Sequence, residues 1–261
     1  MTDARARSDG DLLAGRRALV TGAGRRVGRA IALALGRRGM RVAVHFGQSE
    51  ADARQTCAAI QAAGGDAFAV GADLRDRAAT RALVDAAVER LGGLDLLVVS
   101  AAGFARVEFD AIDDRAWDEL IELDLTSPFV LAQRAATALR RARGSVVFVT
   151  CASTAVPFRH HLPYVVAKGA LAHLTRALAL ELAPDVRVNA VAPGTVLPPD
   201  ELPASERERL AELLPLGRLG DAEDVARAVV FLAESPFVTG VELRVDGGRA
   251  VARREGPPPG A

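Results

Sequence analysis

The sequence predicts a single doubly wound α/β domain, in which a parallel sheet of seven strands carries helices on both faces. Two observations predict this fold class. Short apolar runs rich in valine alternate along the chain with longer segments of helical period, as in parallel sheets that are covered on both sides. A glycine-rich turn follows the first apolar run and opens the first helical segment, as expected where strand and helix meet with little space between them.

Seven strands are expected, one for each apolar run, at 16–20, 41–46, 67–70, 95–100, 145–150, 186–191 and 241–245. The helical segments between them cover 27–38, 50–63, 77–91, 114–142, 164–183 and 221–233. Parallel neighbours need a crossover connection, usually a helix, so this alternation accounts for the connections up to the last strand. No internal repeat of solenoid period is visible.

The alternation runs without a break, so residues 15–250 are expected to form one domain. Residues 1–14 and 251–261 are polar or rich in Pro and Gly, and we expect flexible tails there. The Pro-rich stretch 195–203 interrupts the pattern after the sixth strand. Because open α/β sheets bind ligands at the carboxyl ends of their strands, we expect a substrate lid near 195–215.

Composition excludes several classes of partner. The chain carries 33 basic and 33 acidic residues, so a small molecule is expected rather than a nucleic acid or an anionic membrane. Two cysteines, Cys57 and Cys151, make no disulfide framework and no metal-ligand cluster, which favours a reducing compartment. The polar N-terminus has no apolar signal segment, and no apolar run is long enough to cross a membrane. We therefore expect a cytoplasmic protein.

The turn after the first strand is a candidate phosphate-binding loop. Gly22, Gly24 and Gly28 have the spacing G-x-G-x-x-x-G, one residue longer than the usual dinucleotide fingerprint. Glycines let the backbone approach a pyrophosphate, and the unpaired N–H groups of the following helix stabilise its charge. Taken alone, this spacing also fits an ordinary glycine turn.

The end of the second strand indicates which cofactor such a loop binds. The segment HFGQS lacks the acidic residue that holds the ribose 2′-hydroxyl of NAD. Arg25, Arg26 and Ser49 can instead bind a 2′-phosphate, so NADP(H) is favoured; alternatively, the arginines are only solvated. Asp73 and Leu74 follow the third strand, from where a side chain can reach an adenine ring.

The segment PYVVAKGA holds the only tyrosine and the only lysine of the chain, Tyr164 and Lys168. Residues four apart share one face of a helix. Because a neighbouring cation favours the phenolate, we expect Lys168 to lower the pKa of Tyr164 from its ordinary value of about 10. A phenol shifted in this way is a general acid–base, as needed to protonate a C=O or C=N group reduced by hydride.

These motifs, with RVNAVAPG (187–194) and VTGVELRVDGG (238–248), resemble the short-chain dehydrogenase/reductase superfamily over nearly the whole chain. The resemblance implies a Rossmann-type reductase that assembles as a homotetramer. The cofactor site that it implies comprises Gly22, Arg25, Arg26, Val27, Gly28, Ser49, Asp73, Leu74, Ala101, Tyr164, Lys168, Pro193, Gly194 and Val196.

Within the superfamily, the loop TGAGRRVGRAIA is similar to the TGxxxRxG loop of pteridine reductases, and HFGQS, YVVAKGAL and PGTVLPP are also similar to that subgroup. The resemblance implies a dihydropterin or dihydrofolate-like substrate, stacked between the nicotinamide and an aromatic ring. Phe104 is the candidate ring, although it is equally an ordinary apolar residue after a strand. Arg26, Cys151 and Tyr164 complete the implied substrate site.

Two positions depart from the family pattern. Cys151 stands where the superfamily has a substrate-polarising serine and pteridine reductases have an aspartate. A thiol is a weak donor, so Cys151 either orients a substrate weakly or packs at a strand end, with Thr150 or Ser153 as substitutes. Asp124 replaces the usual asparagine, and its charge can alter the pKa of the tyrosine. The expected catalytic set is Tyr164, Lys168, Cys151 and Asp124.

Two other functions stay open. A carbonyl reductase acting on a 3-oxoacyl thioester, a polyketide or another ketone fits the same motifs. A non-catalytic NADP(H)-binding sensor fits the changes at Cys151 and Asp124, although the retained tyrosine and lysine oppose it. His160 and His161, which precede the tyrosine, are assigned no catalytic role.

Overall fold

The computed structural model describes residues 12–196 and 202–252. Within them, one sheet of seven parallel strands has the order β3-β2-β1-β4-β5-β6-β7. The strands are β1 (Arg17–Thr21), β2 (Arg41–Phe46), β3 (Asp66–Gly71), β4 (Leu96–Val99), β5 (Ser145–Val149), β6 (Arg187–Pro193) and β7 (Glu242–Val245). The predicted doubly wound α/β fold is confirmed.

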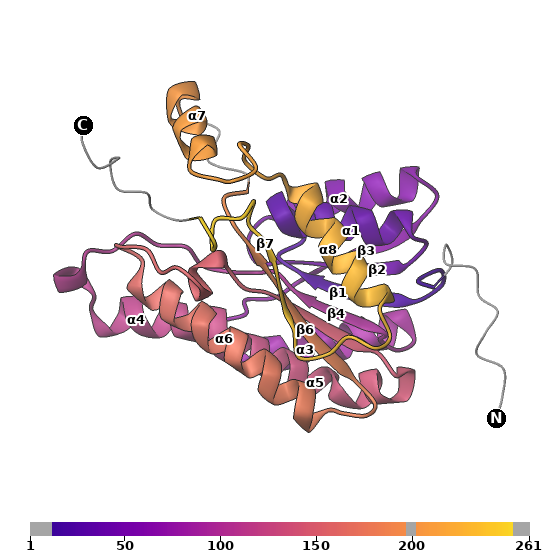
Figure 1. Cartoon of the computed structure of the whole chain (residues 1–261). Helices are drawn as coiled ribbons and strands as arrows, with labels where there is room; N and C mark the ends of the chain where they lie inside the picture. The colour runs from indigo at the N-terminus through magenta and orange to yellow at the C-terminus, as the bar shows by residue number, and fades with distance from the viewer. Residues whose placement is uncertain (1–11, 197–201, 253–261) are drawn as a thin grey trace, which may run out of the picture.

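Helices cover both faces of this sheet (Figure 1). The α-helices of the described residues are α1 (Arg26–Arg37), α2 (Glu50–Ala62), α3 (Arg77–Leu91), α4 (Asp114–Ile121), α5 (Ser127–Ala142), α6 (Leu162–Glu181), α7 (Ala204–Glu212) and α8 (Ala222–Glu234). One core lies between the sheet and α1, α2 and α8, and the other between the sheet and α3, α5 and α6. The layers are those of an α/β/α sandwich.

The central strands are apolar throughout because both of their faces are buried. In β5, Val147 and Val149 pack into the core beneath α1 and α8, whereas Val146 and Phe148 pack into the core beneath α3 and α5. Successive side chains of a strand point to opposite faces. A continuous valine-rich run therefore fits a strand with helices on both sides.

The strand order reverses between β1 and β4, which places a crevice at their carboxyl ends. Thr21 ends β1, and its hydroxyl accepts hydrogen bonds from the N–H groups of Ser100 and Ala101 at 3.0 and 3.1 Å. This side chain ties the glycine loop to the segment that leaves β4. These two hydrogen bonds therefore fix the position of the glycine loop relative to the segment after β4, and this loop and this segment form the two walls of the crevice.

The structure differs from the expected elements in two places. The single helix expected over 114–142 is divided by a π-helical turn, Glu122–Thr126, between α4 and α5. Inside the expected lid, α7 forms a helix that the sequence pattern did not predict, and none of its residues is buried. Figure 1 shows α7 standing away from the sheet. Residues 197–201 of the expected lid lie outside the described residues, so the lid stays a prediction.

The expected N-terminal tail of 1–14 is too long. Leu13 is buried in the core beneath α1, and its carbonyl accepts a hydrogen bond from Arg16. The Gly15 N–H donates to the Gly39 carbonyl at 2.9 Å. Since burying a leucine stabilises a fold by about 1.5–3 kcal/mol, the domain includes Leu13. Residues 1–11 and 253–261 lie outside the described part of the chain.

Over the described ranges, no helix is both long and apolar enough to span a lipid bilayer. The same residues contain no group of three or more His, Cys, Asp or Glu side chains arranged to hold a metal ion.

Replacing Leu97 by Ala tests the core. Leu97 is fully buried in the central strand β4, so we expect Leu97→Ala to lower the free energy of unfolding by about 2–5 kcal/mol through lost burial and an unfilled cavity. Urea unfolding at a fixed protein concentration measures it. The matched control is Leu213→Ala, at an exposed leucine after α7, which should cost less than about 0.5 kcal/mol. Equal losses would contradict this account of the core.

Candidate functional site

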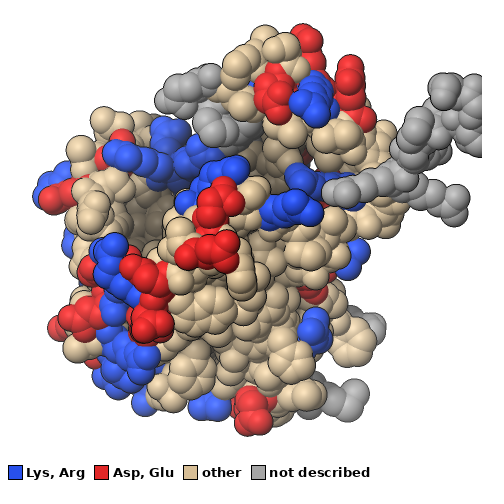
Figure 2. All heavy atoms as spheres, turned by 90° about the vertical axis from the view of Figure 1, so that its left-hand side faces the viewer, with Lys and Arg blue, Asp and Glu red and all other residues tan. Residues whose placement is uncertain are grey.

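A cleft of about 1390 Å³ opens at the carboxyl ends of the strands. The predicted residues that line it are Gly22, Arg25, Arg26, Val27, Gly28, Ser49, Asp73, Leu74, Ala101, Phe104, Cys151, Tyr164, Lys168, Pro193, Gly194 and Val196. The face in Figure 2 is hollowed, and basic side chains gather along the upper rim of the hollow. The cleft brings the predicted nucleotide end and the predicted chemical end together.

The glycine loop leaves no room for side chains at two positions. Gly22 has a φ of +63°, and a Cβ there would lie 2.8 Å from the Cα of Ala101. A Cβ on Gly28 would collide with the carbonyl oxygen of Gly22. Arg26 has a left-handed φ of +51°, a conformation that glycine adopts more easily. Arg26 therefore carries backbone strain that a glycine would avoid.

His45 is a site residue that sequence reasoning missed. Its Nδ1 accepts a hydrogen bond from the Gly22 N–H at 3.1 Å. Its Nε2 lies 3.0 Å from the Ala72 carbonyl, to which it donates because Nδ1 is already an acceptor. The ring is therefore neutral, and burial lowers the pKa of His45 to about 4. The sequence could have indicated this role, because His45 is a polar residue within an otherwise apolar strand.

At the adenosine end, the cleft is lined by more positive than negative groups, with Arg25, Arg26 and Arg75 against the one carboxylate of Asp73. The segment after β2, with Gly47, Gln48 and Ser49, carries no carboxylate into the cleft. Asp73 is held by the Arg75 guanidinium through two contacts, of 3.0 and 2.9 Å, which keep the pKa of that carboxyl below its ordinary value. Arg75 is a lining residue that the sequence analysis did not name.

The two loop arginines differ in their surroundings. Arg25 forms an ion pair with Asp52 of α2, so a 2′-phosphate would share this guanidinium with a carboxylate. Arg26 lines the same cleft. The close approach of Gly22 to Ala101 and the missing carboxylate after β2 fit a dinucleotide with a 2′-phosphate, so the residues present fit NADP(H).

Tyr164 and Lys168 share one face of α6, as predicted. The Lys168 Nζ lies 5.6 Å from the centroid of the phenol ring and donates to the Val149 carbonyl at 3.2 Å. Lys168 is only 2% exposed and Tyr164 9% exposed. Pro163 lies in the first turn of α6, where its missing N–H leaves no bond unmade.

The predicted direction of the Tyr164 pKa shift is wrong for this structure. The pKa of Tyr164 is raised well above its ordinary value, first by burial, then by Cys151 and then by Asp124. Burial disfavours the charged phenolate and is the largest cause of the raised pKa. The phenol is therefore held in its protonated form.

Thr150, Cys151 and Ser153, which follow β5, differ in what they can offer a substrate. The Thr150 hydroxyl donates to the Glu242 carboxylate at 2.7 Å, so it is no substitute donor. Cys151 lines the cleft, and its Sγ accepts a 3.4 Å hydrogen bond from the Ser153 N–H. The buried Ser153 hydroxyl lacks a partner in the described part of the chain, and Ser153 lines the cleft.

An aromatic cluster lies beside the phenol. Phe104 stacks on His161, with ring centroids 4.2 Å apart, and meets Tyr164 edge-on at 5.0 Å. Phe158 lies 6.2 Å from Phe104 and 6.4 Å from Tyr164. The His161 Nδ1 lies 2.8 Å from the Ala105 carbonyl, which fastens the two loops together. Phe104 was predicted as a site residue, whereas the contacts that Phe158 and His161 make with it were not predicted.

Asp124 does not line the cleft. It is fully buried in the π-helical turn, 3.7 Å from the Lys168 Nζ. Asp124 is therefore not placed to contact a substrate in the cleft. Any effect that it has on catalysis has to pass through Lys168.

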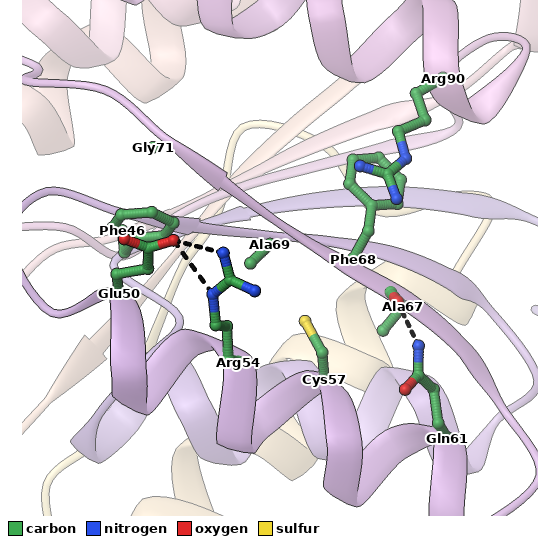
Figure 3. A pocket seen from close by; sticks show the side chains of 10 residues that line it. All are labelled: Phe46, Glu50, Arg54, Cys57, Gln61, Ala67, Phe68, Ala69, Gly71 and Arg90. Atoms are coloured by element: carbon green, nitrogen blue, oxygen red, sulfur yellow. Dashed lines mark hydrogen bonds and ion pairs between the residues drawn. The ribbon is translucent and has the colours of Figure 1, made fainter.

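A second cavity, of about 520 Å³, lies at the outer edge of β3 (Figure 3). Its polar groups already have partners, since Arg54 pairs with Glu50 and Gln61 donates to the Ala67 carbonyl at 2.9 Å. Cys57 points towards this cavity from α2. None of the predicted site residues lines it, so the chemistry belongs to the larger cleft.

Comparison with known families defines the class of protein. The family model described as "Enoyl-(Acyl carrier protein) reductase" matches residues 22–250. The chain is 35% identical over 238 residues to the 3-oxoacyl-[acyl-carrier-protein] reductase FabG of Staphylococcus aureus, covering 88% of this chain and 96% of that protein. This chain belongs to the short-chain dehydrogenase/reductase superfamily and is an oxidoreductase.

Two solved structures of the superfamily contain the expected cofactor. The alternative dihydrofolate reductase 1 FolM of Brucella canis, complexed with NADP, has a TM-score of 0.86 and 34% identity, covering 94% of this chain and 98% of that one. The angucycline C-6 ketoreductase LanV, with bound NADP, has a TM-score of 0.85 and 31% identity, covering 92% and 97%. Both accord with the fit of the cleft to NADP(H).

His45 makes stability depend on pH. Its pKa is about 4 when folded and about 6.5 when unfolded, so below pH 6.5 the unfolded chain takes up the proton first. The stability that His45 contributes is complete above pH 6.5 and is lost as the pH falls towards 4. Between pH 7.5 and 4.5, urea unfolding should show wild type losing about 2–3 kcal/mol more than His45→Gln. Parallel curves for the two proteins would contradict the assignment.

Proposed function

We propose that this protein is an NADPH-dependent reductase that adds hydride to a C=N or C=O carbon of a flat ring compound, with a dihydropterin as the first candidate. The observation that carries the proposal is the group of rings Phe104, Phe158 and Tyr164 beside the buried lysine. Aromatic rings stack on flat heterocycles, and Phe104 is 63% exposed, which leaves contact area for a ligand. The loop TGAGRRVG and the similarity to FolM also support a pterin.

In the proposed reaction, Tyr164 is the general acid. Bound NADPH supplies the hydride. The Tyr164 hydroxyl gives its proton to the substrate heteroatom next to the carbon that is reduced. The raised pKa keeps this phenol protonated at neutral pH, which is the form that a reduction requires. Lys168 is fixed behind it by the Val149 carbonyl.

The substrate heteroatom needs a second donor. Ser153 offers a buried hydroxyl without a partner in the described ranges, whereas Cys151 offers a thiol, which is a weaker donor. We therefore assign the stronger contact to Ser153 and a positioning contact to Cys151. Both residues line the cleft that Tyr164 also lines.

A ketone is the second candidate substrate, because the described residues that line the cleft bring no carboxylate near the phenol. Asp73 is the one acidic residue among the described residues that line the cleft, and Arg75 holds it at the adenosine end. Among the described lining residues, Tyr164 is therefore the group available to protonate a pterin ring nitrogen. A 3-oxoacyl or polyketide carbonyl needs no further acid, and the similarity to FabG and LanV supports it.

The homotetramer and the cytoplasmic location stay predictions. Exposed apolar side chains on α5, α6 and α8 support self-association; they include Phe129, Val166, Leu180 and Phe231.

A substrate panel with Tyr164→Phe tests the function. We expect NADPH to be oxidised with dihydropterins or with ketones, and Tyr164→Phe to lower kcat/KM by about 10²–10⁴-fold because the general acid is lost. The Kd for NADPH should change little. The absorbance of NADPH follows turnover, and its fluorescence follows binding. Turnover of ketones without any pterin would remove the pterin assignment. Unchanged turnover by the variant would remove the role of Tyr164.

A second pair of variants ranks the two donors. Ser153→Ala should lower kcat by about 10²-fold, as loss of a hydroxyl donor to a developing anion does elsewhere. Cys151→Ala should lower kcat by less than about tenfold, because a thiol donates weakly. Steady-state kinetics with the best substrate of the panel give both values. The reverse order would assign the donor role to Cys151.

A further inference from the structure

A buried carboxylate lies behind the lysine of the site. Asp124 is fully buried, and its Oδ1 accepts a hydrogen bond from the Gly103 N–H at 3.0 Å. The same oxygen lies 3.7 Å from the Lys168 Nζ. The other oxygen, Oδ2, is buried and has no hydrogen-bond partner among the described residues. A buried carboxylate with one oxygen unpaired is costly, so its presence in this turn calls for a physical role.

The ionisable groups around the phenol come from three packed elements. Lys168 faces it from α6, Cys151 from the segment after β5, and Asp124 from the π-helical turn. His161, just before α6, stacks on Phe104, whose edge meets the phenol. Apart from His161, which is charged only when protonated, Lys168 is the positive group in this set and Asp124 is its closest negative neighbour.

We propose that Asp124 is a fixed counter-charge to Lys168, so that the phenol of Tyr164 stays protonated and the site works as a proton donor rather than as a proton acceptor. A lone ammonium would stabilise the phenolate. When the ammonium is paired with a carboxylate, the two charges form a neutral dipole. The field of a dipole falls off faster with distance than the field of a single charge, so the pair stabilises the phenolate less. Asp124 is thus a positioning residue that acts through Lys168.

The electrostatics of the site agree with this role. Burial raises the pKa of Asp124, whereas Lys168 lowers it. At the alkaline pH where a phenol titrates, the carboxyl is ionised. Asp124 is one of the groups that raise the pKa of Tyr164, after burial and Cys151. The direction of turnover rests on the proposed function, but the ionisation of the phenol does not.

The chain offers a direct measurement of this ionisation. Tyr164 is the only tyrosine, so the ultraviolet absorbance of phenolate reports this residue alone, with Tyr164→Phe as the baseline and circular dichroism to follow folding. We expect the wild-type phenol to titrate above pH 10 in the folded protein. In Asp124→Asn, which keeps the shape and the acceptor for Gly103, we expect the midpoint to fall by at least about one pH unit.

The control is Asp85→Asn, which removes the same charge from the surface pair between Asp85 and Arg134 and should leave the midpoint unchanged. If Asp124→Asn does not fold, Asp124→Ala gives the same readout. A folded variant with an unchanged or higher midpoint overturns the proposal. So does a wild-type midpoint below pH 10, which is measured without any variant.

A kinetic readout follows for any substrate that the panel identifies. Reduction needs the protonated phenol, so activity is present below its pKa and is lost as the pH rises through that value. The alkaline limb of kcat/KM should therefore move to lower pH in Asp124→Asn, by the same shift as the phenol midpoint. If no substrate is turned over, the proposed function fails while the titration still decides the role of Asp124. A shifted phenol with an unshifted alkaline limb would overturn the link between the counter-charge and proton donation.

Discussion

Burial of one ammonium group constrains the whole chemical end of the cleft. Lys168 is almost completely buried, and a buried charge is tolerated only when it is paired and hydrogen-bonded. Its partners come from the end of β5, through Val149, and from the π-helical turn, through Asp124. The lysine therefore holds strand, turn and α6 in one arrangement, and the phenol four residues away is positioned by the same contacts.

The nucleotide end is positioned by close backbone approach instead. Gly22 lies against Ala101, and Thr21 and His45 hold the loop from two neighbouring strand ends. Few charges are buried there, and its arginines are exposed. The two ends thus differ physically: one excludes water around a compensated charge, and the other presents cationic groups to an anionic ligand. A dinucleotide that links them fits both.

Most of the fold could be predicted because hydrophobic periodicity and connection length point to one topology. The strands and the helices on both faces followed from this periodicity. The residues that line the cleft followed from short motifs and from the family resemblance that those motifs carry. The π-helical turn, α7 and the burial of Leu13 did not, because they depend on tertiary contacts rather than on local pattern. The direction of the Tyr164 shift was mispredicted for the same reason. Sequence showed that a cation was near, but only the structure showed how deeply the phenol is buried and that Asp124 lies 3.7 Å from the lysine.

Three polar side chains each have a buried atom that the described structure leaves unpaired. Their buried atoms are Asp124 Oδ2, Ser127 Oγ and Ser153 Oγ. An unmade hydrogen bond costs about 1–3 kcal/mol, so folding alone favours neither a carboxylate nor a hydroxyl at such places. Asp124 and Ser127 lie three residues apart along the helix that backs Lys168, and Ser153 lines the cleft. Two of these three unpaired groups thus lie where the proposed reaction places its proton and its substrate heteroatom, and functional sites are where local rules of folding are often broken.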